Sequence, residues 1–328
     1  MKPYVAFLFL VFLLVQFTGC DNDENTNPEP VPQWERFQVF PYASLSSVEF
    51  YSNDFGVACG CWGAIFVTKN GGLTWETHKK GEACLANVFV LNDNTFFIGI
   101  NSIYKFSNGG SSFTELAGED VFGPSLTGIH FFDSDNGLVS TCGYIYKTTD
   151  GGRNWYYICD LGSAIRLQFV SDSIGYSYGG YTNDDFSYGE LYKTENQGNS
   201  WQNLSERPEI ADFEIITMYF LNKDTAYMTN CNRELYYTWN GGSTWTMRSD
   251  SVPTHLYDMV FVSENEGYGI GYYGILKTTN GGITWSWDYK HENADLISIA
   301  KTPDNKKLIA VGRGVIMIKK LRNLDTAS

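Results

Sequence analysis

The stretch KTTNGGITW, residues 277–285, decides the fold of this chain. It is a glycine-rich turn between two strand-like runs, and the chain contains six versions of it. The other five are VTKNGGLTW (67–75), KFSNGGSSF (105–113), KTTDGGRNW (147–155), KTENQGNSW (193–201) and YTWNGGSTW (237–245). Counted from the central Asn or Asp, successive copies are 38 to 46 residues apart. A repeat of this length is typical of proteins built from one recurring supersecondary unit.

Each copy, which we call a box, has the chemistry of a tight β-hairpin. An Asn or Asp anchor can accept hydrogen bonds from nearby backbone N–H groups, and the glycine after it tolerates a positive φ. The Thr two places before the anchor can close the turn with its hydroxyl, and the Trp five places after it can fill the hairpin base. Phe106 replaces the Thr in the second copy, and Gln197 replaces the first glycine in the fourth. The anchors and their aromatic partners are Asn70 with Trp75, Asn108 with Phe113, Asp150 with Trp155, Asn196 with Trp201, Asn240 with Trp245, and Asn280 with Trp285.

The box resembles the Asp-box, or BNR repeat, of β-propellers, which is written Ser/Thr-x-Asp-x-Gly-x-x-Trp. Sialidases, sortilin-type receptors, some xyloglucanases and the photosystem II stability/assembly factor-like proteins contain this repeat. The wording here, Lys-Thr-x-Asn/Asp-Gly-Gly-x-Thr-Trp, is most similar to the last group. In that family the box is a hairpin between the third and fourth strands of a blade. The resemblance therefore implies that the box residues hold the blades together and contact no substrate.

The spacing of strand-like runs predicts the number of blades. Two further strand-like runs precede the third strand that leads into each box, which gives six similar units. A seventh unit begins at residue 296 and stops at Lys320 without a box, whereas residues 34–40 (WERFQVF) are similar to an isolated fourth strand. We expect residues 34–320 to form one all-β, seven-bladed β-propeller of four-stranded blades, with residues 321–328 as a C-terminal tail. The N-terminal strand closes the ring by pairing with the C-terminal blade, which removes open sheet edges.

The N-terminal segment is typical of an exported lipoprotein. Residues 1–19 contain an apolar run that is too short to span a bilayer, which indicates a signal peptide. Residues 17–20 (FTGC) resemble a bacterial lipobox, which predicts lipidation of Cys20, although an ordinary signal peptide is the alternative. The acidic run DNDE at 21–24 resembles the surface-export signals of Bacteroidetes lipoproteins. These resemblances imply a lipid-anchored, surface-exposed protein of the bacterial outer membrane, with residues 20–33 as the lipidated Cys and a flexible acidic tether.

Composition excludes several classes of function. The formal net charge of −14 argues against a nucleic-acid partner, because phosphate binding needs a basic stripe. The chain has no CxxC motif and its four His residues are scattered, which disfavours a metal site. Asp184 and Asp185 alone fall short of the oxygen ligands that calcium needs. We expect no metal and no cofactor, and a monomer that contacts the membrane through its lipid anchor only.

Six cysteines follow the lipobox, and an exported chain can form disulfides. Cys142 lies in the turn between the second and third strands of its blade, and we interpret Cys159 as part of the connector after that blade. Cys61 and Cys84 occupy similar places in and after blade one. This parallel predicts the pairs Cys142–Cys159 and Cys61–Cys84, with Cys59 as an alternative to Cys61.

The binding site is expected at one face of the propeller. In such a blade the box and the first turn lie at one face, and the 2–3 turns and the interblade connectors lie at the other. Loops on a rigid scaffold commonly carry binding sites. Exposed aromatic residues beside a few charges suit a peptide or carbohydrate, although they can also simply cover the blade ends. The candidate ligand-binding residues are Trp62, Tyr144, Arg166, Tyr181, Arg233, Asp258, Tyr272, Tyr273 and Arg313.

Two of these candidates, Arg166 and Asp258, belong to a further pattern. Aligning the seven copies places one residue of each innermost strand at an equivalent position near the same face, so that together they form a ring around the axis. Arg166 and Asp258 are its charged members. The predicted ring is Ser47, Asn87, Gly128, Arg166, Thr217, Asp258 and Ile297.

We interpret the chain as a non-catalytic cell-surface protein that binds a partner protein, peptide or glycan. Its resemblance to the assembly-factor group implies a scaffold that helps to assemble or stabilise other proteins. The alternative is a sialidase-like glycoside hydrolase, since one suitably spaced carboxylate pair would suffice for that chemistry. Against it, the Arg-Ile-Pro motif of sialidases is missing. A third interpretation is a structural subunit of a surface complex with exposed apolar patches.

Overall fold

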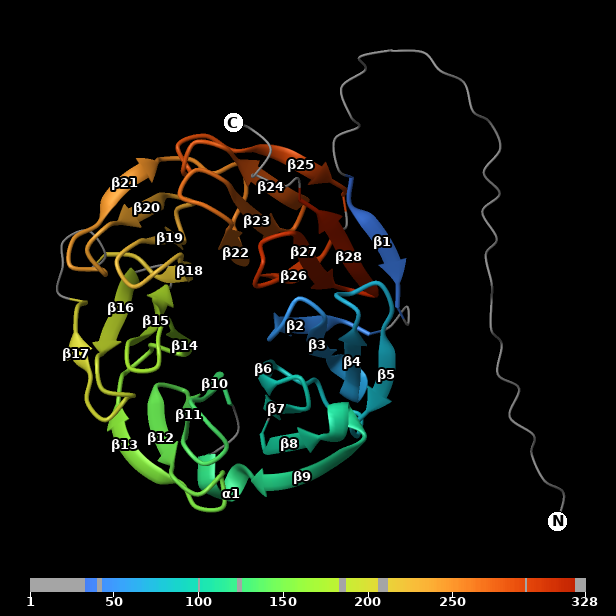
Figure 1. Ribbon diagram of the computed structural model, residues 1–328. Coiled ribbons are helices and arrows are strands. Elements are labelled where there is room, and N and C mark those ends of the chain that lie inside the picture. Colours follow the sequence, from blue (N-terminus) through green and yellow to red (C-terminus); the bar gives the residue numbers. More distant parts are fainter. Residues whose placement is uncertain are drawn as a thin grey trace, which may run out of the picture. The chain divides into compact units, whose positions relative to one another are not determined.

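The computed structural model describes residues 33–39, 43–99, 101–122, 126–182, 187–205, 212–292 and 294–321. Within this part, seven four-stranded sheets lie around a common axis like the blades of a propeller (Figure 1). The predicted all-β, seven-bladed fold is confirmed. The signal peptide, Cys20, the tether up to residue 32, Asp184, Asp185 and residues 322–328 lie outside the described residues. None of the described helices is long and apolar enough to cross a membrane.

Six blades each use four consecutive strands, ordered from the axis outward (Figure 1). The strands are β2 (Leu45–Phe50), β3 (Phe55–Gly60), β4 (Ala64–Lys69) and β5 (Glu76–Lys79) in blade one; β6 (Asn87–Asn92), β7 (Thr95–Gly99), β8 (Ile103–Ser107) and β9 (Ser112–Ala117) in blade two; β10 (Gly128–Phe131), β11 (Gly137–Thr141), β12 (Tyr144–Thr148) and β13 (Tyr156–Asp160) in blade three; β14 (Arg166–Phe169), β15 (Gly175–Thr182), β16 (Ser187–Thr194) and β17 (Gln202–Asn203) in blade four; β18 (Ile215–Phe220), β19 (Ala226–Asn230), β20 (Leu235–Thr238) and β21 (Thr246–Ser249) in blade five; and β22 (Asp258–Phe261), β23 (Gly267–Gly271), β24 (Gly274–Thr278) and β25 (Ser286–Lys290) in blade six. Short helical turns are η1 (Cys61–Gly63), η2 (Asn108–Gly110) and α1 (Glu119–Phe122).

Blade seven joins the two ends of the described chain. Its inner strands are β26 (Leu296–Lys301), β27 (Lys307–Gly312) and β28 (Val315–Lys320), and its outer strand is β1 (Glu35–Gln38). β1 pairs antiparallel with β28 over all four of its residues. The predicted closure by the N-terminal strand is therefore confirmed, with a shorter strand than the seven residues expected.

The boxes form the hairpins between third and fourth strands, as predicted. In blade one, Thr68 Oγ1 donates to Asn70 Oδ1 at 3.0 Å and accepts the Gly72 N–H at 2.8 Å. Asn70 Oδ1 also accepts the Thr74 N–H at 2.9 Å. The same three contacts recur around Asp150, Asn196, Asn240 and Asn280. Each of these hairpins is therefore fixed by its own side chains.

The boxes also join neighbouring blades. The second box glycine adopts a positive φ and lies against the preceding blade. A Cβ added at Gly152 would lie 2.6 Å from Leu116 Cδ1 of blade two, and one at Gly72 would lie 2.8 Å from Ile318 Cδ1 of blade seven. Glycine is favoured here for two reasons, because the backbone conformation strains other residues and an added Cβ would have to displace the end of a neighbouring side chain.

The core lies between blades. At three of the seams, a buried aromatic side chain of one second strand stacks on the last residue of the next blade's innermost strand. The ring-centroid distances are 3.8 Å for Phe97 on Phe131, 3.9 Å for Tyr176 on Phe220 and 3.6 Å for Tyr227 on Phe261. Gly137 and Gly267 lie on second strands and have no side chain. They leave room for the rings of Phe131 and Phe261.

The two faces are those expected from the sequence. At one face the box meets the 1–2 turn, where the Gly71 N–H donates to Asp54 O at 2.8 Å. At the other face the connectors meet the 2–3 turns, where the Lys80 N–H donates to Gly63 O at 2.8 Å. Backbone hydrogen bonds thus join described loops at both faces.

One of the two predicted disulfides is present and the other is not. Cys61 and Cys84 are bonded, as expected. Cys142 and Cys159 are both free thiols, so that prediction was wrong. The reason is that Cys159 lies on the outer strand β13, opposite Ile145, and not in the connector. Cys84, in contrast, does lie in its connector, beyond the end of β5. Blades one and three therefore differ in where the second cysteine lies.

Candidate functional site

A cavity of about 800 Å³ lies among the innermost strands of blades one to four, six and seven. Its wall has three levels, which follow the sequence of each strand. The mouth level comes just after the connectors, the ring level is the next residue, and the deep level lies two residues further. The mouth includes Ser46, Thr127, Ile165, Tyr257 and Ile297; the ring level Ser47, Asn87, Gly128, Arg166, Asp258 and Ser298; and the deep level Glu49, Phe89, His130 and Gln168.

The strand register corrects one member of the predicted ring. Each ring residue pairs with a second-strand residue, as Asp258 pairs with Ile270. In blade seven the equivalent pair is Ser298 with Val311, because Ile297 is the extra residue of a β-bulge. Ser298 therefore takes the ring position, and Ile297 moves to the mouth. Thr217 keeps its predicted position but is buried and does not border the described cavity.

Asp258, a predicted ligand residue, uses its carboxylate within the protein. Oδ1 accepts the N–H of Met259 at 2.9 Å. Oδ2 accepts the Ile299 N–H at 2.9 Å and the Ser298 hydroxyl at 3.2 Å, and both partners belong to the next blade. Burial raises the pKa of Asp258 above its ordinary value, against the opposing effect of these hydrogen bonds. Asp258 thus holds blade six to blade seven and shapes the cavity wall.

Two serines of the ring continue this connection around the axis. Ser298 Oγ accepts the Val48 N–H of blade one, and Ser47 Oγ accepts the Val88 N–H of blade two, each at 3.4 Å. Side chains at the ring level therefore join blade six to blade two in sequence. The cavity wall is fixed by these contacts between innermost strands.

Arg166 differs from the other ring residues because its side chain is exposed and free. No hydrogen bond or ion pair to its guanidinium is made by any other described residue. Its positive charge lowers the pKa values of Asp258 and Tyr178, against the larger raising effect of burial on each. The guanidinium is therefore a free hydrogen-bond donor at the cavity wall, as the sequence alignment suggested.

The deep level holds ionisable groups that the sequence alignment missed. Burial raises the pKa of Glu49 to about 8 and lowers the pKa of His130 to about 4. The His130 ring stacks on Phe169 with centroids 4.3 Å apart. Gln168 Oε1 is buried without a hydrogen-bond partner among the described residues. At neutral pH both titratable groups are uncharged, so the deep level is polar but neutral.

A simple signal could have found these residues. Glu49, His130 and Gln168 each lie two positions after a ring residue, on the same side of the strand. The predicted ring contains only one residue from each innermost strand, and so it leaves out the deeper positions. The mouth residues Ile165 and Tyr257 were missed for the same reason, whereas Ile297 was predicted at the ring level; each of these three residues is 38% to 40% exposed.

The other predicted ligand residues lie at the expected face but not in the cavity. All are exposed on the 2–3 turns or just beside them, and the rings of Tyr272 and Tyr273 meet edge to face at 5.0 Å. Arg313 lies 3.9 Å from a carboxylate oxygen of Asp295. Arg166 and Asp258 are thus brought together in the cavity wall, and seven residues are spread over the surrounding face. These seven are Trp62, Tyr144, Tyr181, Arg233, Tyr272, Tyr273 and Arg313.

No group of three or more His, Cys, Asp or Glu side chains able to hold a metal ion occurs in the part of the chain that the structure describes. Among the described residues, the candidate site is therefore a polar axial cavity with the free guanidinium of Arg166 in its wall and the exposed apolar side chains of Ile165, Tyr257 and Ile297 at its mouth. It is suited to holding a ligand by hydrogen bonds and apolar contact.

The fold and its boxes define the chain as a BNR-type β-propeller. The profile of the family described as "Photosynthesis system II assembly factor YCF48" matches residues 27–176 and 172–280, which together exceed half of the chain. The chain therefore belongs to this family. The family description names an assembly role, in agreement with the prediction that the chain is not an enzyme.

Two curated relatives are similar in sequence. "Photosystem II assembly lipoprotein Ycf48" of Synechocystis sp. is 25% identical over 145 residues, covering 43% of this chain and 41% of that protein. "Photosystem II stability/assembly factor HCF136, chloroplastic" of Oryza sativa subsp. japonica is 25% identical over 237 residues, covering 65% of this chain and 51% of that protein. The chain thus spans about half the length of the curated relatives it matches.

A solved structure described as "YCF48 bound to D1 peptide" has the same fold. It superposes with a TM-score of 0.70 at 18% sequence identity, over 90% of this chain and 100% of that one. At this level of identity the likeness concerns the propeller architecture alone.

Proposed function

We propose that this chain is a non-catalytic scaffold that binds a segment of a partner protein at the mouth of the axial cavity. The observation that carries the proposal is the free guanidinium of Arg166 beside three exposed apolar side chains, those of Ile165, Tyr257 and Ile297. An apolar rim around an unpaired donor gives both buried area and orientation to an extended peptide.

The relatives support a protein partner. Both curated relatives are described as factors in photosystem II assembly, and one solved relative is described as bound to a D1 peptide. For this chain we carry over only the scaffold role, because it spans about half the length of these relatives. We propose that Cys20 carries a lipid anchor, and that the propeller works as a monomer on the outer face of the outer membrane.

A glycan is the second candidate ligand, and the deep level of the cavity favours it. Gln168 Oε1 is a buried acceptor with no partner among the described residues, and the stacked His130 and Phe169 rings beside it add aromatic surface to the lining. Sugars combine hydrogen-bonding groups with apolar ring faces, so both features suit them. A glycosidase is less well supported, because the Asp258 carboxylate already accepts three hydrogen bonds.

Binding of a partner at the cavity mouth is tested with the soluble fragment of residues 22–328. The fragment is crosslinked to native outer membranes and also applied to a glycan array, beside the variants Arg166→Glu and Tyr257→Ala. We expect a defined crosslinked protein whose yield falls about tenfold in either variant, which corresponds to about 1.4 kcal/mol of binding free energy.

The matched control is the triple variant with Trp62, Tyr272 and Tyr273 changed to Ala, which removes exposed aromatics of the same face outside the cavity. It should keep the crosslink. Loss of the crosslink in the triple variant alone would move the site to the 2–3 turns. Glycan binding that depends on Gln168, without any protein crosslink, would replace the peptide proposal by the second candidate.

A further inference from the structure

The seventh blade contains a box that is split between the two ends of the described chain. In blade one, Trp75 is the last residue before β5. One residue of β4 pairs with the first residue of β5, and Thr68 comes directly after it. In blade seven, Trp34 is the last residue before β1. One residue of β28 pairs with the first residue of β1, and Lys319 comes directly after it. Trp34 therefore stands at the position of the box Trp, and Lys319 at that of the box Thr.

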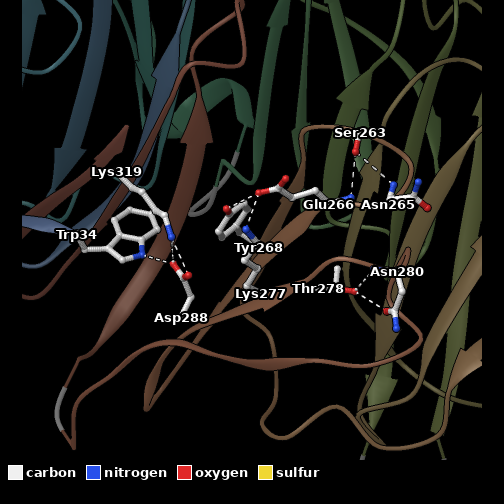
Figure 2. A network of polar contacts seen from close by, with 10 residues as sticks. All are labelled: Trp34, Ser263, Asn265, Glu266, Tyr268, Lys277, Thr278, Asn280, Asp288 and Lys319. Carbon is white, nitrogen blue, oxygen red and sulfur yellow. Dashed lines mark hydrogen bonds and ion pairs between the residues drawn. The ribbon is translucent and has the colours of Figure 1, made fainter. Parts of the chain in front are cut away.

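The split box has an ion pair at its centre. Lys319 Nζ lies 2.7 and 2.6 Å from the two carboxylate oxygens of Asp288, and the Trp34 indole N–H donates to Asp288 Oδ2 at 2.7 Å. Only 4% of the Lys319 side chain and 10% of the Asp288 side chain are exposed. Figure 2 shows these three residues in one view with Thr278 and Asn280 of the contiguous box of blade six, in which Thr278 bonds to Asn280. The Lys319 ammonium thus stands in place of the box hydroxyl, and its partner is a carboxylate of the preceding blade, whereas the Thr of an ordinary box bonds to the carboxamide or carboxylate of its own anchor.

Asp288 occupies a position that faces the next blade. It is the extra residue of a bulge in β25, as Leu116 is in β9. Leu116 packs under the box of blade three, against Gly152. Blade six therefore presents a carboxylate where blade two presents an apolar side chain. The partners of this carboxylate, Lys319 and Trp34, come from opposite ends of the described chain.

We propose that Trp34, Asp288 and Lys319 form a latch, which fixes the closing strand β1 in the ring and makes the β1–β28 pairing of blade seven the place where the ring opens. In blades one to six, the chain runs continuously through the box from the third strand to the outer strand. In blade seven, β1 meets β28 only through non-covalent contacts. Removing either charge leaves the other buried without its ion-pair partner, which is unfavourable. The latch therefore has two states, and loss of its ion pair releases β1 as a unit.

The latch is tested by amide hydrogen exchange on the full chain, with Asp288→Asn and Lys319→Met as the breaking variants. Asp288→Asn keeps the size of the side chain and an acceptor for Trp34. We expect exchange in β1 and β28 to speed up about a hundredfold or more, while exchange in the outer strand β5 stays as in the wild type. The control is Glu76→Gln, which breaks the exposed Lys69–Glu76 ion pair of blade one and should leave exchange in β1 unchanged.

A double variant, Asp288→Leu with Lys319→Val, replaces the ion pair by a leucine, as at Leu116, and by a valine, which has the shape of the usual box threonine. Well-packed apolar replacements of buried ion pairs are commonly tolerated, so we expect protection of β1 to return to within about threefold of the wild type. Wild-type protection of β1 in either single variant would overturn the latch. So would an equal loss of protection in all seven blades, or a double variant no better than the single ones.

Discussion

At the scale of single residues, Glu49 gives the clearest dependence on pH. Burial raises the pKa of its carboxyl to about 8 in the folded protein, from 4.5 in the unfolded chain. The folded state thus binds this proton more tightly, so the contribution of Glu49 to stability is full below about pH 4.5. It is lost as the pH rises to about 8. Glu49→Gln removes the charge and keeps an acceptor for the Val90 N–H. We expect this variant to be more stable than the wild type by about 1 kcal/mol or more at pH 9.

Urea unfolding at pH 5 and pH 9 measures this difference. At pH 5 the carboxyl is protonated in the folded protein, so the Glu49→Gln variant and the wild type should nearly agree. Glu76→Gln on the exposed outer strand of blade one is the control, and it should follow the wild type at both pH values. A stability difference that is the same at pH 5 and pH 9 would contradict the assignment of a neutral Glu49.

At the scale of the element, the box hairpin depends on its second glycine. Gly152 and Gly81 both have a positive φ, so Ala at either position carries a similar backbone strain. A Cβ at Gly152 would meet Leu116 at 2.6 Å, whereas one at Gly81 would meet nothing within 4 Å. We expect Gly152→Ala to cost about 1–3 kcal/mol more than Gly81→Ala in thermal or urea unfolding. Equal costs would mean that backbone strain alone fixes the glycine, and that the contact between blades contributes nothing.

The sequence predicts some structural features of this protein better than others. The boxes, the blade number and the closing strand depend on local hairpin chemistry and on repetition, which a single sequence displays directly. The bulge before Ser298 and the outer-strand position of Cys159 depend on register, and a slip of one residue changes which side chain reaches a given place. Sequence reasoning therefore located the cavity ring through Arg166 but missed its deep level. It also left the split box unrecognised, since Trp34 and Lys319 are adjacent only in the closed ring.

At the scale of the whole molecule, the proposed anchor at Cys20 leads to a test of location. A lipid on Cys20 would tie the propeller to the bilayer through the residues that precede it. Each acyl CH₂ that enters the membrane contributes about 0.8 kcal/mol, and two or more chains hold a protein stably. We expect Cys20→Ser to move the protein from the membrane fraction to the soluble fraction, with unchanged thermal unfolding of the propeller. Protease added to intact cells should remove the wild-type protein. A Cys20→Ser protein that stays with the membrane would show that another feature holds it there, and a wild-type protein that resists external protease would place it on the inner side.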